Sequence, residues 1–169
     1  MLNEKISKMI NEQIKKEFFS GYLYLQFANW YAYEGYNGFA NWYTIQAQEE
    51  RDHAMKIIAY MYENGEYVDL EEIQKPASVL EAPIDAMKMA LEHERYITNS
   101  INEIYAEAFE QKDFKTMQFL DWFIKEQGEE EANAEELLTN MERFGEDPRG
   151  CFMLDREAAA RVYNPPVAE

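Results

Sequence analysis

Cysteine is nearly absent from this chain: Cys151 is the only one among 169 residues. A single cysteine excludes a disulfide framework and a cysteine-based metal cluster, and it agrees with a reducing compartment. The chain also lacks any stretch approaching the roughly 18 uninterrupted apolar residues of a membrane-spanning helix. Its first residues, MLNEKISKM, contain no apolar signal region, so we expect a cytoplasmic protein with no membrane partner.

Basic residues are also scarce. Sixteen Lys and Arg stand against 33 Asp and Glu, which gives a formal net charge of −17. Because phosphate recognition needs clustered Lys and Arg, this balance argues against nucleic acid as a partner. It permits attraction of cations, although most acidic proteins are acidic only for solubility. With 47% apolar and 29% charged residues, the composition predicts a globular chain, and the length predicts one domain over residues 1–169.

Prolines and most glycines fall at a few breaks, and no period-2 run indicates a strand. Between the breaks, the periodicity predicts helices at about residues 3–34, 39–64, 83–111 and 114–144, with a short fifth helix at about 152–162. The first ends at the GYNG stretch of residues 35–38 and the fourth at Gly145 and Pro148. Asp155 either lies inside the fifth helix or caps a shorter one.

The lengths of the connections predict the topology. Short turns join the first helix to the second and the third to the fourth, so each pair is antiparallel. Residues 66–82 form a much longer connection, which can travel the length of a bundle and let the second and third helices run parallel. The sequence therefore predicts an all-α fold, a four-helix bundle with one long crossover and a short C-terminal helix.

Each long helix carries a glutamate near the centre of its apolar stripe. Positions three, four and seven residues away share a helical face, and around these glutamates they are mostly apolar. Each glutamate also lies near the midpoint of its helix, so helices packed side by side bring all of them to one height, together with His53 and Gln127. The four central glutamates are Glu17, Glu50, Glu94 and Glu130.

Four ionised carboxylates in an apolar interior repel one another and are costly to bury. No basic residue occupies the neighbouring stripe positions, and burying four protonated acids gives the fold no evident gain. Two divalent cations would balance the four charges and would make Glu50 and His53 ligands on one helical face. One glutamate in such a stripe is more often a surface residue, so the prediction depends on four in register. Carboxylates with one imidazole and no thiolate favour iron or manganese.

These motifs resemble those of the prokaryotic non-haem ferritins. The matching stretches are GFANWYTIQAQEERDHAMK at 38–56, EHE at 92–94 and FLDWFIKEQGEEE at 119–131, and the resemblance covers essentially the whole chain. It implies a ferritin-like bundle that oxidises Fe(II) with dioxygen or hydrogen peroxide. It also implies that the Fe(III) product is stored as mineral inside a hollow shell.

The resemblance further implies roles at matching positions. The ferroxidase centre would contain two iron sites, with Glu50 as the bridge between them. Its residues are Glu17, Glu50 and His53 at the first site, and Glu94, Glu130 and Gln127 at the second. Tyr24 matches a tyrosine beside such a centre, although a buried core tyrosine explains it equally well. A third, weaker iron site toward the inner surface would add three glutamates to Glu130. They are Glu49, Glu126 and Glu129.

Two departures from related patterns affect these expectations. The symmetric di-iron pattern repeats Glu-x-x-His on two helices, whereas the fourth helix here has Gln127-x-x-Glu130, so we expect inequivalent irons with the second held more weakly. Haem-binding bacterioferritins carry a methionine directly before the histidine of the second helix. Asp52 stands there in this chain, so we expect no haem. His93 points about 100° away from Glu94 and is expected at the surface.

The first helix is apolar almost all round, from Phe18 and Phe19 to Tyr22 and Leu25. A bundle helix needs one buried face, so a second apolar face predicts a subunit contact. The resemblance implies a homo-oligomer of twenty-four subunits. The alternative from another class is a small di-iron oxidase or peroxidase that keeps its irons and acts on an external substrate. The absence of rubredoxin-like cysteines weighs against it.

Overall fold

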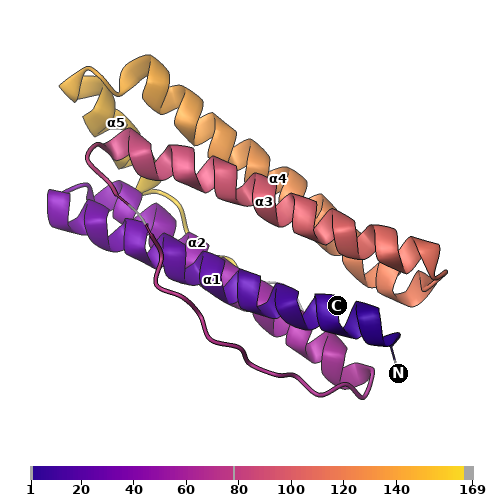
Figure 1. Cartoon of the computed structure of the whole chain (residues 1–169). Helices are drawn as coiled ribbons and strands as arrows, with labels where there is room; N and C mark the ends of the chain where they lie inside the picture. Colours follow the sequence, from indigo (N-terminus) through magenta and orange to yellow (C-terminus); the bar gives the residue numbers. More distant parts are fainter. Residues whose placement is uncertain (1, 78, 166–169) are drawn as a thin grey trace.

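The computed structural model describes residues 2–77 and 79–165, and within them it contains five helices and no strand. The helices are α1 (Glu4–Glu34), α2 (Asn37–Glu63), α3 (Pro83–Glu110), α4 (Phe114–Phe144) and α5 (Pro148–Ala158). Figure 1 shows the four long helices side by side, with α5 at one end of the bundle. None of these helices combines the length and apolarity needed to cross a bilayer. The predicted all-α bundle is confirmed.

The connection between α2 and α3 runs along the bundle, as predicted. It returns from one end to the other, so α2 and α3 run parallel while α1–α2 and α3–α4 are antiparallel (Figure 1). The side chain of Glu66 accepts hydrogen bonds from the N–H of Leu2 (2.8 Å) and the hydroxyl of Ser7 (2.9 Å). Asn11 exchanges two hydrogen bonds of 2.9 Å with the backbone of Asp69. These contacts hold the crossover against α1.

Two helices begin earlier than predicted. α2 starts at Asn37, because the break after α1 is limited to Gly35 and Tyr36; Gly35 has a φ of 89°, which glycine adopts without strain. α5 spans 148–158 instead of 152–162. Asp147 caps it by accepting a hydrogen bond from the N–H of Arg149, and Pro148 occupies its first turn. Pro148, one of the two residues predicted to stop α4, therefore also starts α5.

Asp155 lies inside α5, and its side chain caps α2. Its Oδ1 accepts a hydrogen bond of 2.9 Å from the N–H of Phe39, in the first turn of α2, where Tyr36 provides no side-chain cap. Gly38 permits this approach, since a Cβ there would lie 1.5 Å from the carbonyl oxygen of Asp155. The start of α2 and the end of α5 are thus fastened together.

The apolar core is divided into two clusters along the bundle. Each long helix contributes to both clusters, and its central glutamate lies between the two contributions. The first cluster includes Ile14, Ile57, Ile97 and Phe123, one from each long helix in order, and the second includes Leu23, Tyr43, Ala90 and Met141. The core therefore contains a polar layer near mid-length, the arrangement that the glutamate positions predicted.

Candidate metal centre

The polar layer is formed by side chains from all four long helices. Six of the residues that the sequence singled out are there, and each is at most 5% exposed. They are Glu17 of α1, Glu50 and His53 of α2, Glu94 of α3, and Gln127 and Glu130 of α4. The helical period puts these side chains on inward faces, and their mid-helix positions give them a common height.

The first ligand group lies between α1 and α2. One oxygen from each of Glu17 and Glu50 and one ring nitrogen of His53 lie within 4.8 Å of one another. Nδ1 of His53 is 3.3 Å from Oε2 of Glu50 and 3.9 Å from Oε2 of Glu17. Gly21 allows the two helices to approach closely here, because a Cβ on it would lie 3.1 Å from the carbonyl oxygen of Ala47. The three side chains suit one divalent cation with oxygen and nitrogen ligands.

The second ligand group joins α2, α3 and α4 and shares Glu50 with the first. Oxygens of Glu50, Glu94 and Glu130 lie within 4.8 Å of one another. Glu94 is held from two sides: the hydroxyl of Tyr24 donates to its Oε1, and Nε2 of Gln127 donates to its Oε2 over 3.1 Å. Because Glu50 belongs to both groups, two bound cations would be neighbours.

Two buried glutamines belong to the layer and were not predicted from the sequence. Nε2 of Gln13 donates a hydrogen bond of 2.7 Å to Oε1 of Glu17. Nε2 of Gln46 donates to Oε1 of Glu50 over 3.0 Å and to Oε2 of Glu130 over 2.7 Å. Each glutamine lies four residues before a glutamate on the same helix, a spacing at which side chains meet. The repeated Gln-x-x-x-Glu pattern is the signal that would have revealed them.

Burial and repulsion favour the protonated form of three carboxyl groups. Burial, and then the charge of Glu50, raises the pKa of Glu17 and of Glu94 to about 8, and the same causes raise the pKa of Glu130 well above its usual value. Burial also disfavours charge on Glu50 and His53, but their mutual attraction outweighs it, so the pKa of Glu50 is lowered and that of His53 raised. Without a cation, the layer therefore holds an ion pair among neutral acids.

Two buried side-chain atoms of the first ligand group lack a hydrogen-bond partner among the described residues. They are Oε2 of Glu17 and Nδ1 of His53. Buried polar atoms nearly always have a hydrogen bond, so two atoms without one in the same group are unusual. A divalent cation between them would take both as ligands, and a set of carboxylates with one imidazole fits iron or manganese.

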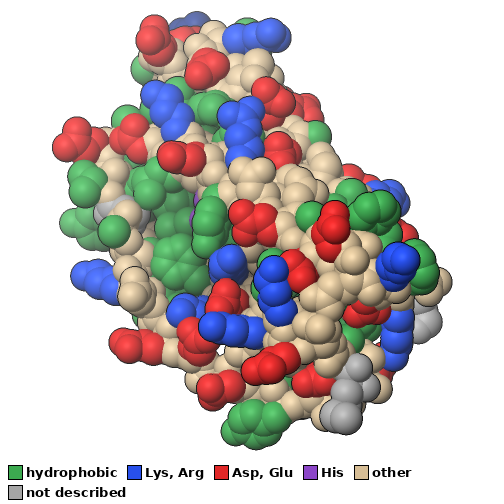
Figure 2. Space-filling model, turned by 45° about the vertical axis from the view of Figure 1, so that its right-hand side comes forward, with side chains coloured by type: hydrophobic (Ala, Val, Ile, Leu, Met, Phe, Trp, Pro, Cys, Tyr) green, Lys and Arg blue, Asp and Glu red, His purple; other side chains and the backbone are tan. Residues whose placement is uncertain are grey.

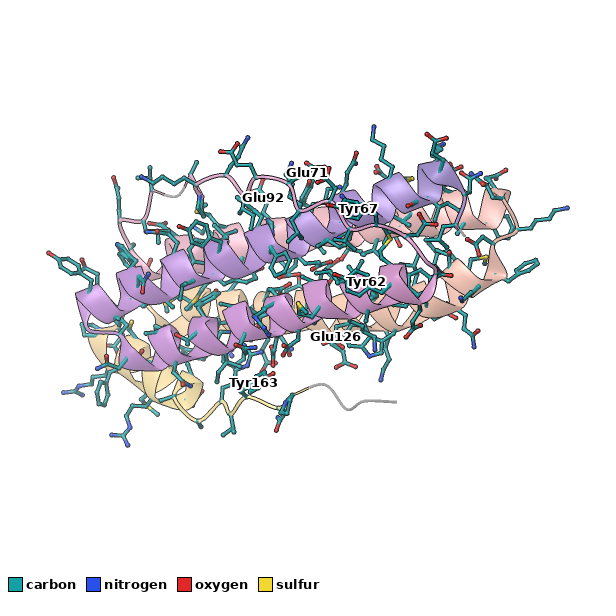
Figure 3. All side chains as sticks on the ribbon, turned by 90° about the horizontal axis from the view of Figure 1, so that it is seen from below. Tyr62, Tyr67, Glu71, Glu92, Glu126 and Tyr163 are labelled. Atoms are coloured by element: carbon teal, nitrogen blue, oxygen red, sulfur yellow. The ribbon has the colours of Figure 1, made fainter. Side chains whose placement is uncertain are left out.

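The structure does not bring the three additional glutamates of the implied third site into one group. Glu49 forms an ion pair with Arg161, and Glu129 lies 3.6 Å from Lys125 on an exposed face of α4. Glu126 lies beside α2 (Figure 3), with its Oε1 3.6 Å from Nε2 of the histidine in the first ligand group. Of the three, Glu126 alone shares a candidate ligand group with that histidine.

His93 was expected at the surface, and that expectation was wrong. It is half-buried between α1 and α3, with Nε2 2.7 Å from Oγ of Ser20 and its ring edge-on to that of Tyr24 at 5.9 Å. A residue that points away from the polar layer can still face a neighbouring helix, and here that helix is α1. Tyr24 is consequently enclosed between His93 and Glu94.

Comparison with known proteins identifies the family. A family model described as a ferritin-like domain matches residues 7–144. The chain is 35% identical over 157 residues to a probable bacterial non-heme ferritin-like protein of Haemophilus influenzae, covering 93% of this chain and 95% of that protein. It is 34% identical over 156 residues to a bacterial non-heme ferritin of Campylobacter jejuni, covering 92% and 93%. The chain belongs to the ferritin family.

Solved structures share the fold of this ferritin. A closed form of the Archaeoglobus fulgidus ferritin, engineered by site-directed mutagenesis, matches with a TM-score of 0.94 and 37% identity over 97% of this chain and all of that one. The open-pore ferritin of the same archaeon matches with a TM-score of 0.93 and 38% identity, covering 95% and 98%. The resemblance to non-haem ferritins is confirmed.

Space beside the second ligand group of this ferritin is small. A hollow of about 20 Å³ is lined by residues that include Tyr24, Trp42, Glu94 and Glu130. Pockets for organic ligands of drug size are roughly 300–1,000 Å³. The hollow therefore has room for an ion or a molecule of about the size of water, and none for an organic substrate.

Proposed function

We propose that this ferritin stores iron and oxidises Fe(II) in its polar layer. The observation that carries the proposal is the pair of buried ligand groups that share Glu50. Membership of the ferritin family and the named bacterial non-heme ferritins among its relatives support iron as the metal. Iron is here both substrate and cargo, entering as Fe(II) and leaving the layer as Fe(III) for deposition as mineral.

Each residue of the layer has a role in this proposal. Glu17 and His53 hold the first Fe(II), Glu94 and Glu130 hold the second, and Glu50 bridges the two. Gln127 orients Glu94 through the hydrogen bond described above, and stands where a symmetric centre would have another ligand. The second Fe(II) therefore has only oxygen ligands from the protein and is held more weakly than the first.

Tyr24 donates its hydroxyl hydrogen to Glu94. Burial, followed by the charge of Glu94, raises the pKa of this tyrosine well above its usual value. We propose that it remains protonated and fixes the carboxylate of Glu94 toward the second Fe(II). Its position beside that ligand supports a place in the centre more than a packing role alone.

Two Fe(II) ions supply two electrons at one place. Two electrons and two protons reduce dioxygen to hydrogen peroxide, and two electrons and two protons reduce hydrogen peroxide to two water molecules. Both oxidants have only two heavy atoms, so the small hollow beside Glu94 and Glu130 favours them over any organic substrate. Carboxyl groups that lose protons when Fe(II) binds are a local source of the protons. The proposed product in either case is a pair of Fe(III) ions.

Storage of ferric mineral requires a hollow shell, and the apolar surface of α1 supports the assembly of subunits into one. Tyr22 and Leu25 are 53% and 41% exposed, and they line a hollow of about 540 Å³ with Phe18 and Ile73. A second hollow, of about 460 Å³, lies on the α3 side of α1. Figure 2 shows apolar side chains gathered in a hollow among charged ones. We propose that such surfaces join twenty-four subunits into a shell of roughly 480 kDa, from the 20.0 kDa of one chain.

Three finer assignments remain proposals. A third iron site at Glu49, Glu126 and Glu129 requires a cation to compete with Arg161 for Glu49, so we expect it to bind iron weakly. The cytoplasmic location and the lack of haem stay predictions from the sequence.

The proposal is tested by oxidation of Fe(II) in the assembled protein. Fe(II) is added without oxygen, air is admitted, and the absorbance of ferric product is followed before size-exclusion chromatography. We expect rapid oxidation and co-elution of the colour with a very large particle. Rapid oxidation with all ferric product outside such a particle would support the small oxidase instead.

The variant Glu50→Ala should slow oxidation by roughly a hundredfold or more, since it removes a ligand from both groups, and even the loss of a residue that only hydrogen-bonds a metal ligand costs roughly 10–100-fold. Glu92→Ala is the matched control, because Glu92 lies two residues from Glu94 but is exposed. It should oxidise Fe(II) at the parent rate. Equal rates in all three proteins would refute the assigned site.

A further inference from the structure

The segment that follows α5 folds back along α2. Nδ2 of Asn41 donates a hydrogen bond of 3.1 Å to the carbonyl oxygen of Arg161. Further along α2, the hydroxyl of Tyr163 donates to Asp52, and Figure 3 shows Tyr163 between this segment and the helix. Residues 161–163 therefore lie beside the part of α2 that runs from Asn41 to Asp52. This part of α2 contains Glu50, which belongs to both ligand groups.

Arg161 uses its guanidinium to contact three residues of α2. Nη1 donates to Oε1 of Gln46 over 2.8 Å and to the carbonyl oxygen of Trp42 over 3.3 Å. Nη2 pairs with Glu49, and the guanidinium carbon stands 4.3 Å from the centre of the Trp42 ring. An arginine held by a stacked ring, an amide and a carboxylate has little freedom to reorient.

Gln46 connects this arginine to both ligand groups. Its side chain is 5% exposed, and Nε2 donates to Glu50 and Glu130, as described above. A guanidinium has donors only, so it fixes Oε1 of the amide toward itself and Nε2 toward the two carboxylates. The opposite orientation would point the amide oxygen at both carboxylates and the amide nitrogen at a cation.

We propose that Arg161 is a positioning residue for the iron pair, acting through Gln46 on Glu50 and Glu130. This inference rests on the proposed ferroxidase function. Gln46 touches one ligand of the first group and two of the second. Arg161 therefore acts chiefly on the second cation, and it is the one residue of this segment that we assign to the support of the metal centre.

Anaerobic binding of Co(II) tests the role without requiring turnover. Co(II) is titrated into the assembled, metal-free protein, and its visible absorbance resolves a first and a second ion per subunit. In Arg161→Gln, we expect the second Co(II) to bind about tenfold more weakly or worse, the usual range when a residue that orients a metal ligand is lost. The first should change by less than about threefold.

The matched control is Tyr163→Phe. It cuts the hydrogen bond from the same segment to Asp52 but leaves the contact between Arg161 and Gln46. Both Co(II) affinities should equal those of the parent. If Tyr163→Phe weakens the second ion as much as Arg161→Gln does, general loosening of the segment is the cause, and the positioning role is overturned.

Gln46→Ala completes the test, because a residue that acts through another has no effect once that residue is gone. Arg161→Gln should weaken the second Co(II) in the parent but not further in the Gln46→Ala background. An equal loss in both backgrounds, or none in the parent, overturns the inference. The parent titration separately tests the proposed function, since that function requires two ions per subunit whatever Arg161 does.

Discussion

At the scale of single residues, the polar layer is tolerated in the core because protons replace cations. The acids with raised pKa values are Glu17, Glu94 and Glu130, while His53 keeps Glu50 ionised. A raised carboxyl pKa stabilises the folded chain below the usual value near 4.5, and this contribution is lost as the pH rises through about 8. The cation-free protein should therefore lose stability as the pH rises from 5 to 8. Over the same range the carboxylates should bind a cation more tightly, because they have fewer protons to release.

Binding of a divalent cation should consequently release protons. Near pH 7, loading with redox-inert Zn(II) should release roughly four protons per subunit, about three from the raised carboxyls and about one from His53. Near pH 9.5 the release should be smaller, because Glu17 and Glu94 are then already ionised. A pH-indicator dye in weakly buffered solution measures the number. Equal release at both pH values would contradict the protonation of these carboxyl groups in the cation-free protein.

The candidate ligand residues were predictable from the sequence, and so were Tyr24 and Gln127 beside Glu94, but Gln46 and Arg161 were not. A glutamate in an apolar stripe stands out, since its charge conflicts with its surroundings, and this identified Glu50 and His53. Gln46 is an ordinary polar residue until the orientation of its amide is known. Arg161 is far from α2 in sequence, so no helical period connects them, and its position depends on how the chain folds back after α5.

At the scale of elements, α5 acts as the cap of α2. The helix bounds were predicted to within two residues for the four long helices, because their breaks are marked by glycine, proline or capping residues. The start of α5 was missed by four residues, since Pro148 was taken only as a stop. The hydrogen bond between the N–H of Phe39 and the side chain of Asp155 joins residues far apart in the sequence, so no local sequence pattern predicts it.

The glycine at position 38 should therefore be less replaceable than one in the middle of a helix. Gly38→Ala should lower the melting temperature, because its Cβ would meet the backbone of Asp155, and loss of the cap alone costs about 1 kcal/mol. Gly128→Ala is the matched control, since a Cβ there meets nothing within 4 Å. It should keep or raise stability, by up to about 1 kcal/mol. Thermal unfolding compares them, and equal melting temperatures would show that α5 does not depend on this contact.

At the scale of the whole molecule, the proposed oxidation of Fe(II) needs only one subunit, whereas storage needs an assembly of subunits. Both ligand groups are complete within one chain, whereas a hollow shell requires many chains. The second apolar face of α1 was predicted from its composition, because a bundle helix needs only one buried face. The geometry of a shell cannot be read from one chain's sequence in the same way, since it depends on the angles between subunits.

Disrupting the contact should separate the two activities. Leu25→Glu places a charge in the larger hollow beside α1 and should give particles much smaller than the shell in size-exclusion chromatography. Oxidation per subunit should stay within about twofold of the parent, while ferric product no longer elutes with the protein. Leu25→Met, which nearly conserves volume, should leave the shell intact. A full-sized shell from Leu25→Glu would mean that this face is not a subunit contact.

The attachment of Leu2 and of residues 161–163 to the bundle has a practical consequence for preparing the protein. The N–H of Leu2 is bound to Glu66 of the crossover, and residues 161–163 lie against α2. A purification tag fused close to Leu2 or to residues 161–163 would lie next to one of these attachments. Untagged material, or material from which the tag has been cleaved, is therefore the appropriate sample for comparing iron loading among variants.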